Sequence, residues 1–188
     1  MLRLLTTTAI GVGLLFASTS FAQTSHPNPA TGPAETTVPK LDQQDSNFIK
    51  EAAAGGMAEI ELSKIATKSV NPEVKRFAER MVRDHTAAGT ELTGIATELG
   101  AAVPKSLDTD HQKVREQLAN MHGPAFDRQY VQIMVDDHDQ AVTLFRQEIS
   151  SGHDPRLKQF AQKVLTTIEE HRKMALDLSG RLSKTAAQ

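Results

Sequence analysis

The stretch Asn71-Pro-Glu-Val-Lys-Arg-Phe-Ala-Glu-Arg-Met-Val returns later in the chain as Asp154-Pro-Arg-Leu-Lys-Gln-Phe-Ala-Gln-Lys-Val-Leu. Both stretches open with a side chain that can cap a helix and with a proline at the first helical position, where the missing backbone N–H has no helical partner to lose. Apolar residues then recur at helical spacing. The shared proline, lysine and Phe-Ala positions indicate one helix used twice, and we predict helices over residues 72–100 and 155–182.

Apolar periodicity also predicts the remaining helices. Further long helices are expected over residues 45–69 and 124–151, and a short one over residues 108–121. The long helices then form two pairs, one on each side of residues 101–123. Antiparallel pairs that bury their apolar faces against each other make a four-helix bundle. The predicted fold class is therefore all-α, with the bundle over residues 45–183.

The connection between the two helix pairs contains the short extra helix and is long enough to cross the bundle. Two chain orders fit this length, a simple up-and-down order and the long crossover of ferritin-like bundles. The sequence leaves both open. Residues 184–188 are expected to form a short tail.

The N-terminus has the pattern of an export signal. Arg3 supplies a positive charge, residues 9–17 are apolar or small, and Ser20-Phe21-Ala22 is a small-x-small cleavage site. We predict a signal peptide over residues 1–22 that is cleaved after Ala22, which leaves a periplasmic protein with no membrane span. A retained membrane anchor is the alternative, but the apolar run is short for a span.

Residues 23–44 are predicted to be a flexible, proline-rich tether. They contain few large apolar side chains and include Pro27, Pro29, Pro33 and Pro39. Segments of this composition cannot bury enough apolar surface to fold alone.

Composition excludes several functions. The formal net charge is −2 and aromatic residues make up 4 % of the chain, so neither a basic surface nor a base-stacking surface for nucleic acid is expected. The chain has no cysteine, which excludes disulfides, thiolate metal sites, cysteine nucleophiles and a lipoprotein anchor.

Four polar side chains fall on the apolar stripes of the long helices, one on each helix. They are Glu59, His85, His138 and His171. At a rise of ~1.5 Å per residue, each lies near the middle of its helix. We therefore expect the four side chains to converge in the middle of the bundle.

An inward carboxylate with inward imidazoles is suited to Zn, Fe or Mn, and ferritin-like proteins hold metal in the bundle core. The Glu-x-x-His spacing of dimetal proteins is absent, because Val82 and Ile168 stand three residues before His85 and His171. A single transition-metal ion held by the four residues fits better than a dimetal site. The alternative is a buried Glu–His hydrogen-bond cluster without metal, since buried charge persists when it is paired.

Other polar residues are expected to be less informative. Neighbours on a helix point ~100° apart, so acids beside the core histidines should mostly be solvated. These acids are Asp84, Asp136, Asp137 and Glu170, of which Asp137 borders the core stripe. Asp127 is interpreted as an acid of a first helical turn, and Tyr130 as a core residue. The three histidines expected at the surface are His111, His122 and His153.

Four segments together resemble a known family. They are Met57-Ala-Glu-Ile-Glu-Leu, Phe77-Ala…Met81-Val…Asp84-His85, Gly123-Pro-Ala-Phe-Asp-Arg-Gln-Tyr130 and Phe160-Ala…Glu170-His171. The chain resembles, over residues 42–182, a widespread family of exported bacterial proteins of unknown function with a ferritin-like helical domain, often labelled outer membrane proteins. The resemblance implies the bundle fold, an envelope location and recurrent Glu and His positions that correspond to the four core residues. It implies no established activity, and the chain has no cysteine for lipidation.

No residue pattern identifies a reaction, so the sequence does not say whether the protein is an enzyme. Two hypotheses about function follow from the sequence. The first is a periplasmic metal-binding bundle with a redox or metal-handling role in envelope stress. The second is a non-catalytic envelope interaction or structural protein whose polar core fixes the register of the helices. Protein partners are not predicted by the sequence, and metal analysis of the purified protein would separate the two hypotheses.

Overall fold

The computed structural model describes residues 41–186, and within that range the chain is all-α, as predicted, with no strand. The five helices are α1 (Gln43–Ala66), α2 (Pro72–Glu98), α3 (Thr109–Ala119), α4 (Gly123–Ser151) and α5 (Pro155–Ala186). The predicted signal peptide and most of the predicted tether lie outside the described residues. No helix within residues 41–186 is long and apolar enough to cross a membrane.

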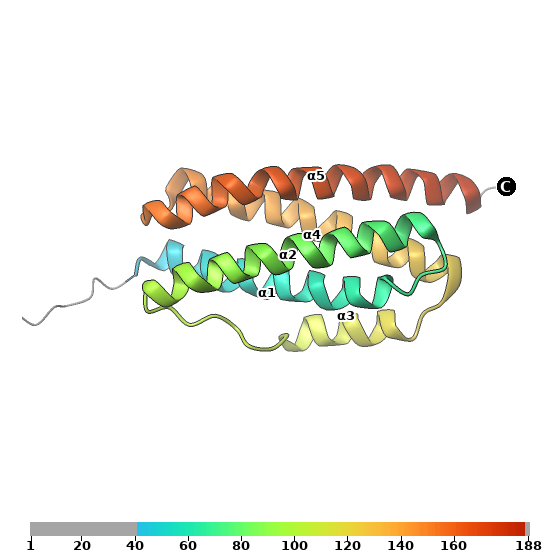
Figure 1. Ribbon diagram of the computed structural model, residues 1–188, viewed down its shortest axis with the longest axis horizontal. Coiled ribbons are helices and arrows are strands. Elements are labelled where there is room, and N and C mark those ends of the chain that lie inside the picture. Colours follow the sequence, from blue (N-terminus) through green and yellow to red (C-terminus); the bar gives the residue numbers. More distant parts are fainter. Residues whose placement is uncertain (1–40, 187–188) are drawn as a thin grey trace, which may run out of the picture. The chain divides into compact units, whose positions relative to one another are not determined.

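The four long helices pack side by side as two antiparallel hairpins, α1 with α2 and α4 with α5 (Figure 1). The hairpins meet where α1 packs on α4 and α2 packs on α5. α3 lies outside this bundle, against α1 and α4. Because α4 begins at the opposite end of the bundle from the end of α2, the connection that carries α3 runs along the bundle (Figure 1). The simple up-and-down order is therefore not the one adopted.

The two related helices begin with the same cap. Asn71 Oδ1 accepts hydrogen bonds from the backbone N–H groups of Glu73 (2.9 Å) and Val74 (3.4 Å). Asp154 Oδ1 accepts from the N–H groups of Arg156 (2.9 Å) and Leu157 (3.4 Å) in the same way. The sequence repeat is thus a structural repeat, since both copies satisfy the free N–H groups of a helix start identically.

The two copies of the repeat contribute to different parts of the core, because α2 and α5 run in opposite directions. Phe77 of α2 packs near Tyr130, with ring centroids 6.1 Å apart. Phe160 of α5 packs against Phe48 and Phe145, at 6.2 Å and 6.0 Å. The core is therefore divided into two apolar clusters, one at each end of the bundle.

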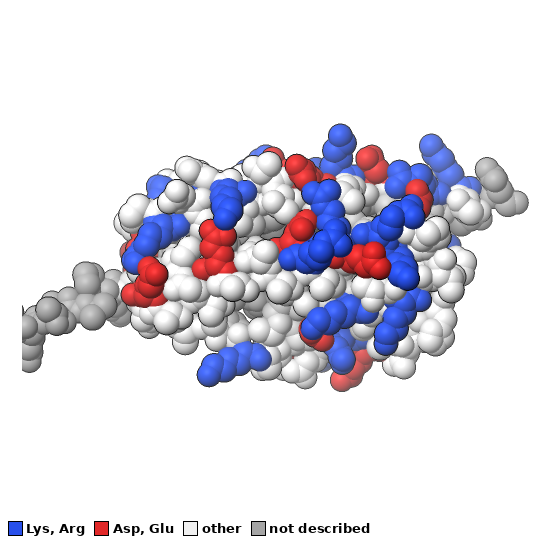
Figure 2. All heavy atoms as spheres, in the orientation of Figure 1, with Lys and Arg blue, Asp and Glu red and all other residues white. Residues whose placement is uncertain are grey.

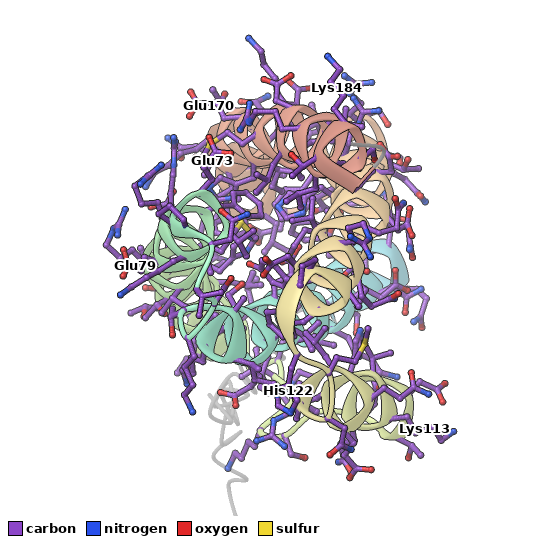
Figure 3. All side chains as sticks on the ribbon, turned by 90° about the vertical axis from the view of Figure 1, so that its right-hand side faces the viewer. Glu73, Glu79, Lys113, His122, Glu170 and Lys184 are labelled. Atoms are coloured by element: carbon purple, nitrogen blue, oxygen red, sulfur yellow. The ribbon has the colours of Figure 1, made fainter. Side chains whose placement is uncertain are left out.

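We call these clusters the Tyr130 half and the Phe160 half. The buried members of the Tyr130 half are Leu62, Ala66, Val74, Phe77, Ala78, Met81, Leu118, Phe126, Tyr130, Val131, Met134, Val135, Ala175 and Leu178. The buried members of the Phe160 half are Phe48, Ile49, Leu92, Ala96, Phe145, Leu157, Phe160, Ala161, Val164 and Ile168. Figure 3, a view along the bundle, shows the four long helices around this filled interior and Lys113 of α3 outside it.

Ion pairs run along the outer seam between α2 and α5. Basic and acidic side chains lie next to each other over these helices instead of forming a patch of one sign (Figure 2). The pairs are Arg181–Glu73, Arg80–Glu170, Lys163–Glu91 and Arg156–Glu98. Exposed pairs of this kind contribute little to stability, so the apolar interior holds the helices together.

Tyr130 is a core residue, as predicted. It is fully buried and its hydroxyl is 2.8 Å from Ser63 Oγ. The interpretation of Asp127 as a first-turn acid was wrong, because Asp127 is buried beyond the first turn of α4 and accepts a hydrogen bond from Ser69 Oγ (2.6 Å) in the α1–α2 turn. That contact ties one hairpin to the other.

The three loop histidines are largely peripheral. His122 and His153 are exposed, in agreement with the sequence prediction, and Figure 3 shows His122 beside α3, outside the four long helices. His111 is half-buried instead, and its Nδ1 is 2.6 Å from Asp108 Oδ2 at the start of α3.

Candidate metal centre

All four polar residues predicted to point inward do so, and they meet between the two halves of the core. Glu59 comes from α1, His85 from α2, His138 from α4 and His171 from α5. His138 and His171 are completely buried, and Glu59 and His85 are 5 % and 9 % exposed. Each is carried inward by the apolar stripe of its own helix, since the flanking turns are anchored in the Tyr130 half or the Phe160 half.

The three histidines form a compact group. Each offers one ring nitrogen such that the three nitrogens all lie within 4.8 Å of one another. The ring centroids are separated by 5.2 Å to 5.6 Å. Glu59 stands beside this group, with Oε2 3.0 Å from His85 Nδ1 and Oε1 3.3 Å from His138 Nδ1.

His138 has a defined tautomer. Its Nδ1 lies 2.8 Å from the carbonyl oxygen of Met134, one turn earlier on α4. A carbonyl oxygen only accepts, so Nδ1 carries the proton and Nε2 carries a lone pair. This buried Nε2 has no hydrogen-bond partner among the described residues. A buried lone pair without a partner is costly, and a metal ion is one group that would satisfy it.

His171 is oriented by Asp84. Its Nε2 lies 2.8 Å from Asp84 Oδ2, which also accepts from Arg80 Nε at 3.1 Å. Burial acts to raise the pKa of Asp84, but the hydrogen bonds from His171 and Arg80 outweigh it and the pKa is lowered. Asp84 is therefore a carboxylate that accepts from His171 Nε2–H, and the Nδ1 lone pair of His171 faces His85 Nε2 at 3.3 Å.

The direction of the hydrogen bond between His85 and Glu59 follows from that arrangement. His85 Nε2 must donate to His171 Nδ1, so His85 Nδ1 carries a lone pair and Glu59 Oε2 must donate to it. Glu59 is then a neutral acid. Burial and the nearby charge of Asp137 raise the pKa of Glu59 well above its usual range, which agrees with this assignment. The Glu59–histidine contacts are thus hydrogen bonds between neutral groups.

All three imidazoles are neutral at physiological pH. Burial, with the neighbouring His138 and His171 adding to it, lowers the pKa of His85 to about 3. Burial also lowers the pKa of His138 to about 4. It lowers the pKa of His171 as well, despite the opposing effect of Asp84. Neutral imidazole is the form that binds a metal ion.

Sequence reasoning missed Asp84, which was expected to be solvated. Its side chain is 29 % exposed and reaches His171 across the α2–α5 contact. The available signal was Arg80, one turn earlier, because a basic residue there holds the carboxylate in place. The other neighbouring acids behave as predicted: Asp136 and Glu170 are exposed, and Asp137 is half-buried.

Burial raises the pKa of Asp137 to about 6, with the charge of Asp136 adding to the effect and His111 opposing it. Asp137 does not contact the three histidines directly. It lines a cleft that also reaches Glu59 and His85. We call the layer formed by Glu59, His85, His138 and His171 the polar layer. Asp84 closes this layer on the α2–α5 side, and the layer is open toward the cleft.

Fold and site together define a class: an all-α helical bundle with a layer of buried neutral histidines between two apolar clusters. The model of a protein family, Domain of unknown function (DUF4142), matches residues 30–178. The chain belongs to this DUF4142 family. No curated protein matches the sequence.

Two solved structures share the helical fold. A DUF305 fragment from Deinococcus radiodurans has a TM-score of 0.67 and 13 % identity, and the match covers 76 % of this chain and 99 % of that chain. A DUF305 protein from Streptomyces coelicolor, described as secreted, has a TM-score of 0.65 and 16 % identity, covering 74 % and 92 %. At such low identity the likeness concerns the fold alone.

Proposed function

We propose that this protein is a periplasmic, ferritin-like helical-bundle protein that binds one transition-metal ion in the middle of the bundle. The ion would be held by His85, His138 and His171, with Glu59 beside them as a supporting group or fourth ligand. The single observation that carries the proposal is the set of three buried imidazole nitrogens within 4.8 Å of one another.

The second nitrogen of each histidine supports the proposal. Metal-binding histidines usually donate their other N–H to a carboxylate or a backbone carbonyl, which orients the ring. His138 donates to Met134 O and His171 to Asp84. His85 Nδ1 lies against Glu59 Oε2. If His85 donates to Glu59 in its other tautomer, each imidazole has one outer acceptor and one nitrogen free for the ion.

The ligand set suits Zn, Fe or Mn, since imidazole binds Zn and Fe well and an added carboxylate accommodates Mn. Three protein ligands leave a coordination position for water or a substrate. We propose that the protein uses this ion in a metal-handling or redox role in envelope stress.

Export is proposed on the signal-like pattern of residues 1–22 and the proline-rich residues after it. The Streptomyces coelicolor neighbour that is described as secreted is consistent with this location. Cell fractionation with N-terminal sequencing would test it. Recovery of an uncleaved chain in membranes would contradict a cleaved, periplasmic protein.

The metal proposal is tested by loading and elemental analysis. The purified mature chain is stripped with a chelator, offered Zn²⁺, Fe²⁺ or Mn²⁺ separately, and desalted. We expect about one ion per chain for at least one metal and loss of binding on His138→Leu or His171→Leu, since each removes one of three ligands. The matched control is His122→Leu, because His122 is exposed and lies away from the core.

A second candidate is a non-catalytic envelope interaction or structural protein. The observation that favours it is that Glu59 Oε2 already satisfies His85 Nδ1 without a metal. Replacing a buried polar pair by apolar residues can then be neutral or stabilising. A wild type that retains no metal, together with a more stable Glu59→Leu/His85→Leu double variant, would favour this candidate over the first.

A further inference from the structure

A cleft of about 750 Å³ opens into the Phe160 half of the core. It passes between α1 and α2, is bordered by the α2–α3 connection and by α4, and reaches apolar side chains of α5. Its mouth includes the exposed residues Thr90 and Thr93, so solvent reaches it. Small-molecule sites usually measure roughly 300–1,000 Å³, and this cleft falls in that range.

The cleft exists because one wall has almost no side chains. Residues 52–56 of α1 read Ala-Ala-Ala-Gly-Gly, and Gly89 faces them from α2. A Cβ atom added at Gly55 or Gly89 would meet no atom within 4 Å. The opposite wall is apolar and bulky. Its large apolar residues are Leu92, Leu144, Phe145, Phe160, Val164 and Ile168.

The charged groups along the cleft differ in whether a partner of opposite charge lies beside them. At the mouth, Lys50 and Glu51 have opposite charges, and Asp108 is paired with His111. Asp137 lines the same cleft and lies near Glu59 and His111. Asp137 has no hydrogen-bond or ion-pair partner among residues 41–186, and Lys50 is the one lysine or arginine among the residues that line the cleft. The cleft therefore combines a long apolar wall with one carboxylate that has no lysine or arginine partner and only His111 nearby as a group of opposite charge.

We propose that this cleft binds a small amphiphilic cation, with its apolar body against Phe145, Phe160 and Val164 and its ammonium head on Asp137. The geometry favours this polarity over the opposite one, because an anionic head would meet the Asp137 carboxylate, and the lysine of the lining, Lys50, lies on the exposed side beside Glu51. The proposal goes beyond the metal site and does not depend on it, since none of the contacts it uses requires an ion.

The test uses three eight-carbon probes that differ only in the head group: octylamine, 1-octanol and octanoate. Binding is measured by calorimetry at pH 7.5, with the full mature chain kept metal-free by a chelator. We expect octylamine to bind about tenfold more tightly than octanol, as one favourable ion pair allows, and octanoate to bind most weakly.

Two variants assign the binding to the cleft. Asp137→Asn should reduce octylamine affinity to that of octanol, while the matched control Asp136→Asn, on the exposed side of the same helix, should leave it unchanged. Ala53→Phe, which places a ring in the cleft, should weaken octylamine and octanol alike. Circular dichroism confirms that each variant is folded.

Three results would overturn the proposal: no binding of octylamine to folded protein, equal affinity for octylamine and octanoate, or equal losses in Asp136→Asn and Asp137→Asn. Because the measurement excludes metal, any of these would leave the metal proposal standing. Failure of metal loading would equally leave the cleft proposal standing.

Discussion

The two halves of the core are built from similar residues but differ in how completely they are filled. In the Tyr130 half, Phe77, Phe126 and Tyr130 pack in a closed interior, and Tyr130 finds a partner in Ser63. In the Phe160 half, Phe145 and Phe160 form one wall of a cleft of about 750 Å³. The difference comes mainly from α1: it presents Leu62 and Ala66 to the first half, whereas in the second half Phe48 and Ile49 are followed by only Ala and Gly at residues 52–56.

The polar layer lies where the closed half meets the open half. The closed half excludes water from His138 and His171, whose pKa values are consequently lowered. The cleft of the open half reaches Glu59 and His85, so a small molecule can approach the layer through the cleft. A site needs both a dry environment and a route of access, and the unequal halves provide one each.

The largest expected effect compares the repeat-equivalent phenylalanines. Phe77→Ala should cost about 4 kcal/mol of unfolding free energy, as expected for a buried ring in a closed core. Phe160→Ala should cost about 1–2 kcal/mol less, because the space left by its ring merges with a cleft that water already reaches. Urea denaturation of both variants measures this. An equal or larger loss in Phe160→Ala would show that the two halves do not differ as described.

The next effect is the response of the polar layer to acid. In metal-free protein, burial lowers the pKa of His85 to about 3 and of His138 to about 4, whereas each is near 6.5 in the unfolded chain. Below pH 6.5 the unfolded chain therefore binds protons that the folded chain does not. The stability that these two neutral histidines contribute is fully present above pH 6.5 and is lost as the pH falls toward 4, by about 2 kcal/mol for each histidine at pH 5.

Glu59 opposes this loss, which provides a control. Its raised pKa keeps it protonated in the folded chain at pH values where the unfolded chain has lost the proton, so its effect on stability improves as the pH falls. Glu59→Gln should therefore steepen the acid loss, and His122→Gln at the surface should leave it unchanged. Urea unfolding from pH 7.5 to 4.5 measures the slopes. A wild-type profile as steep as that of Glu59→Gln would contradict a neutral Glu59 beside the buried histidines.

A smaller effect concerns Gly152 at the α4–α5 turn, near the Phe160 half. A Cβ atom there would lie 2.4 Å from Glu148 Oε1 and 2.6 Å from the Glu148 backbone oxygen. Because backbone cannot move aside cheaply, Gly152→Ala should destabilise the protein by about 1–3 kcal/mol. Thermal unfolding followed by circular dichroism measures the shift, and an unchanged melting temperature would mean that the turn has room to relax.

The smallest expected effect is a gain in stability at the cleft wall. Gly55→Ala adds a Cβ atom that meets nothing within 4 Å and removes the helical cost of glycine, so it should stabilise the protein by about 0.5–1 kcal/mol. Measuring Gly152→Ala in the same assay compares a glycine beside open space, Gly55, with a glycine beside filled space, Gly152. Destabilisation by Gly55→Ala would show that α1 packs more closely there than the cleft implies.

Local signals in the sequence were sufficient to predict much of the fold. The repeated Asn-Pro and Asp-Pro starts located α2 and α5, since a cap and a proline act within one helical turn. The helical ends differ from prediction by a few residues, as at α1, which begins at Gln43 with Asp42 as its cap. The inward placement of Glu59 and the three histidines followed from periodicity alone, because a side chain on an apolar stripe has only the core to enter.

Contacts between helices could not be predicted in the same way. Asp84 lies off the apolar stripe of α2, and its contact with His171 depends on how closely α2 and α5 approach. Asp127 likewise meets Ser69 only because two hairpins that are distant in sequence come together. Such contacts depend on helix rotation and spacing, which packing of the whole core sets.

The sequence by itself determined the helices, the repeat and the set of polar residues that face inward, because each depends on residues within one or two helical turns. Only the tertiary structure decided the chain order across the bundle, the tautomer of each histidine and the position of the cleft. These depend on atoms brought together from four helices, and a hydrogen bond or a cavity is defined at tenths of an ångström, a scale that a helical pattern does not specify.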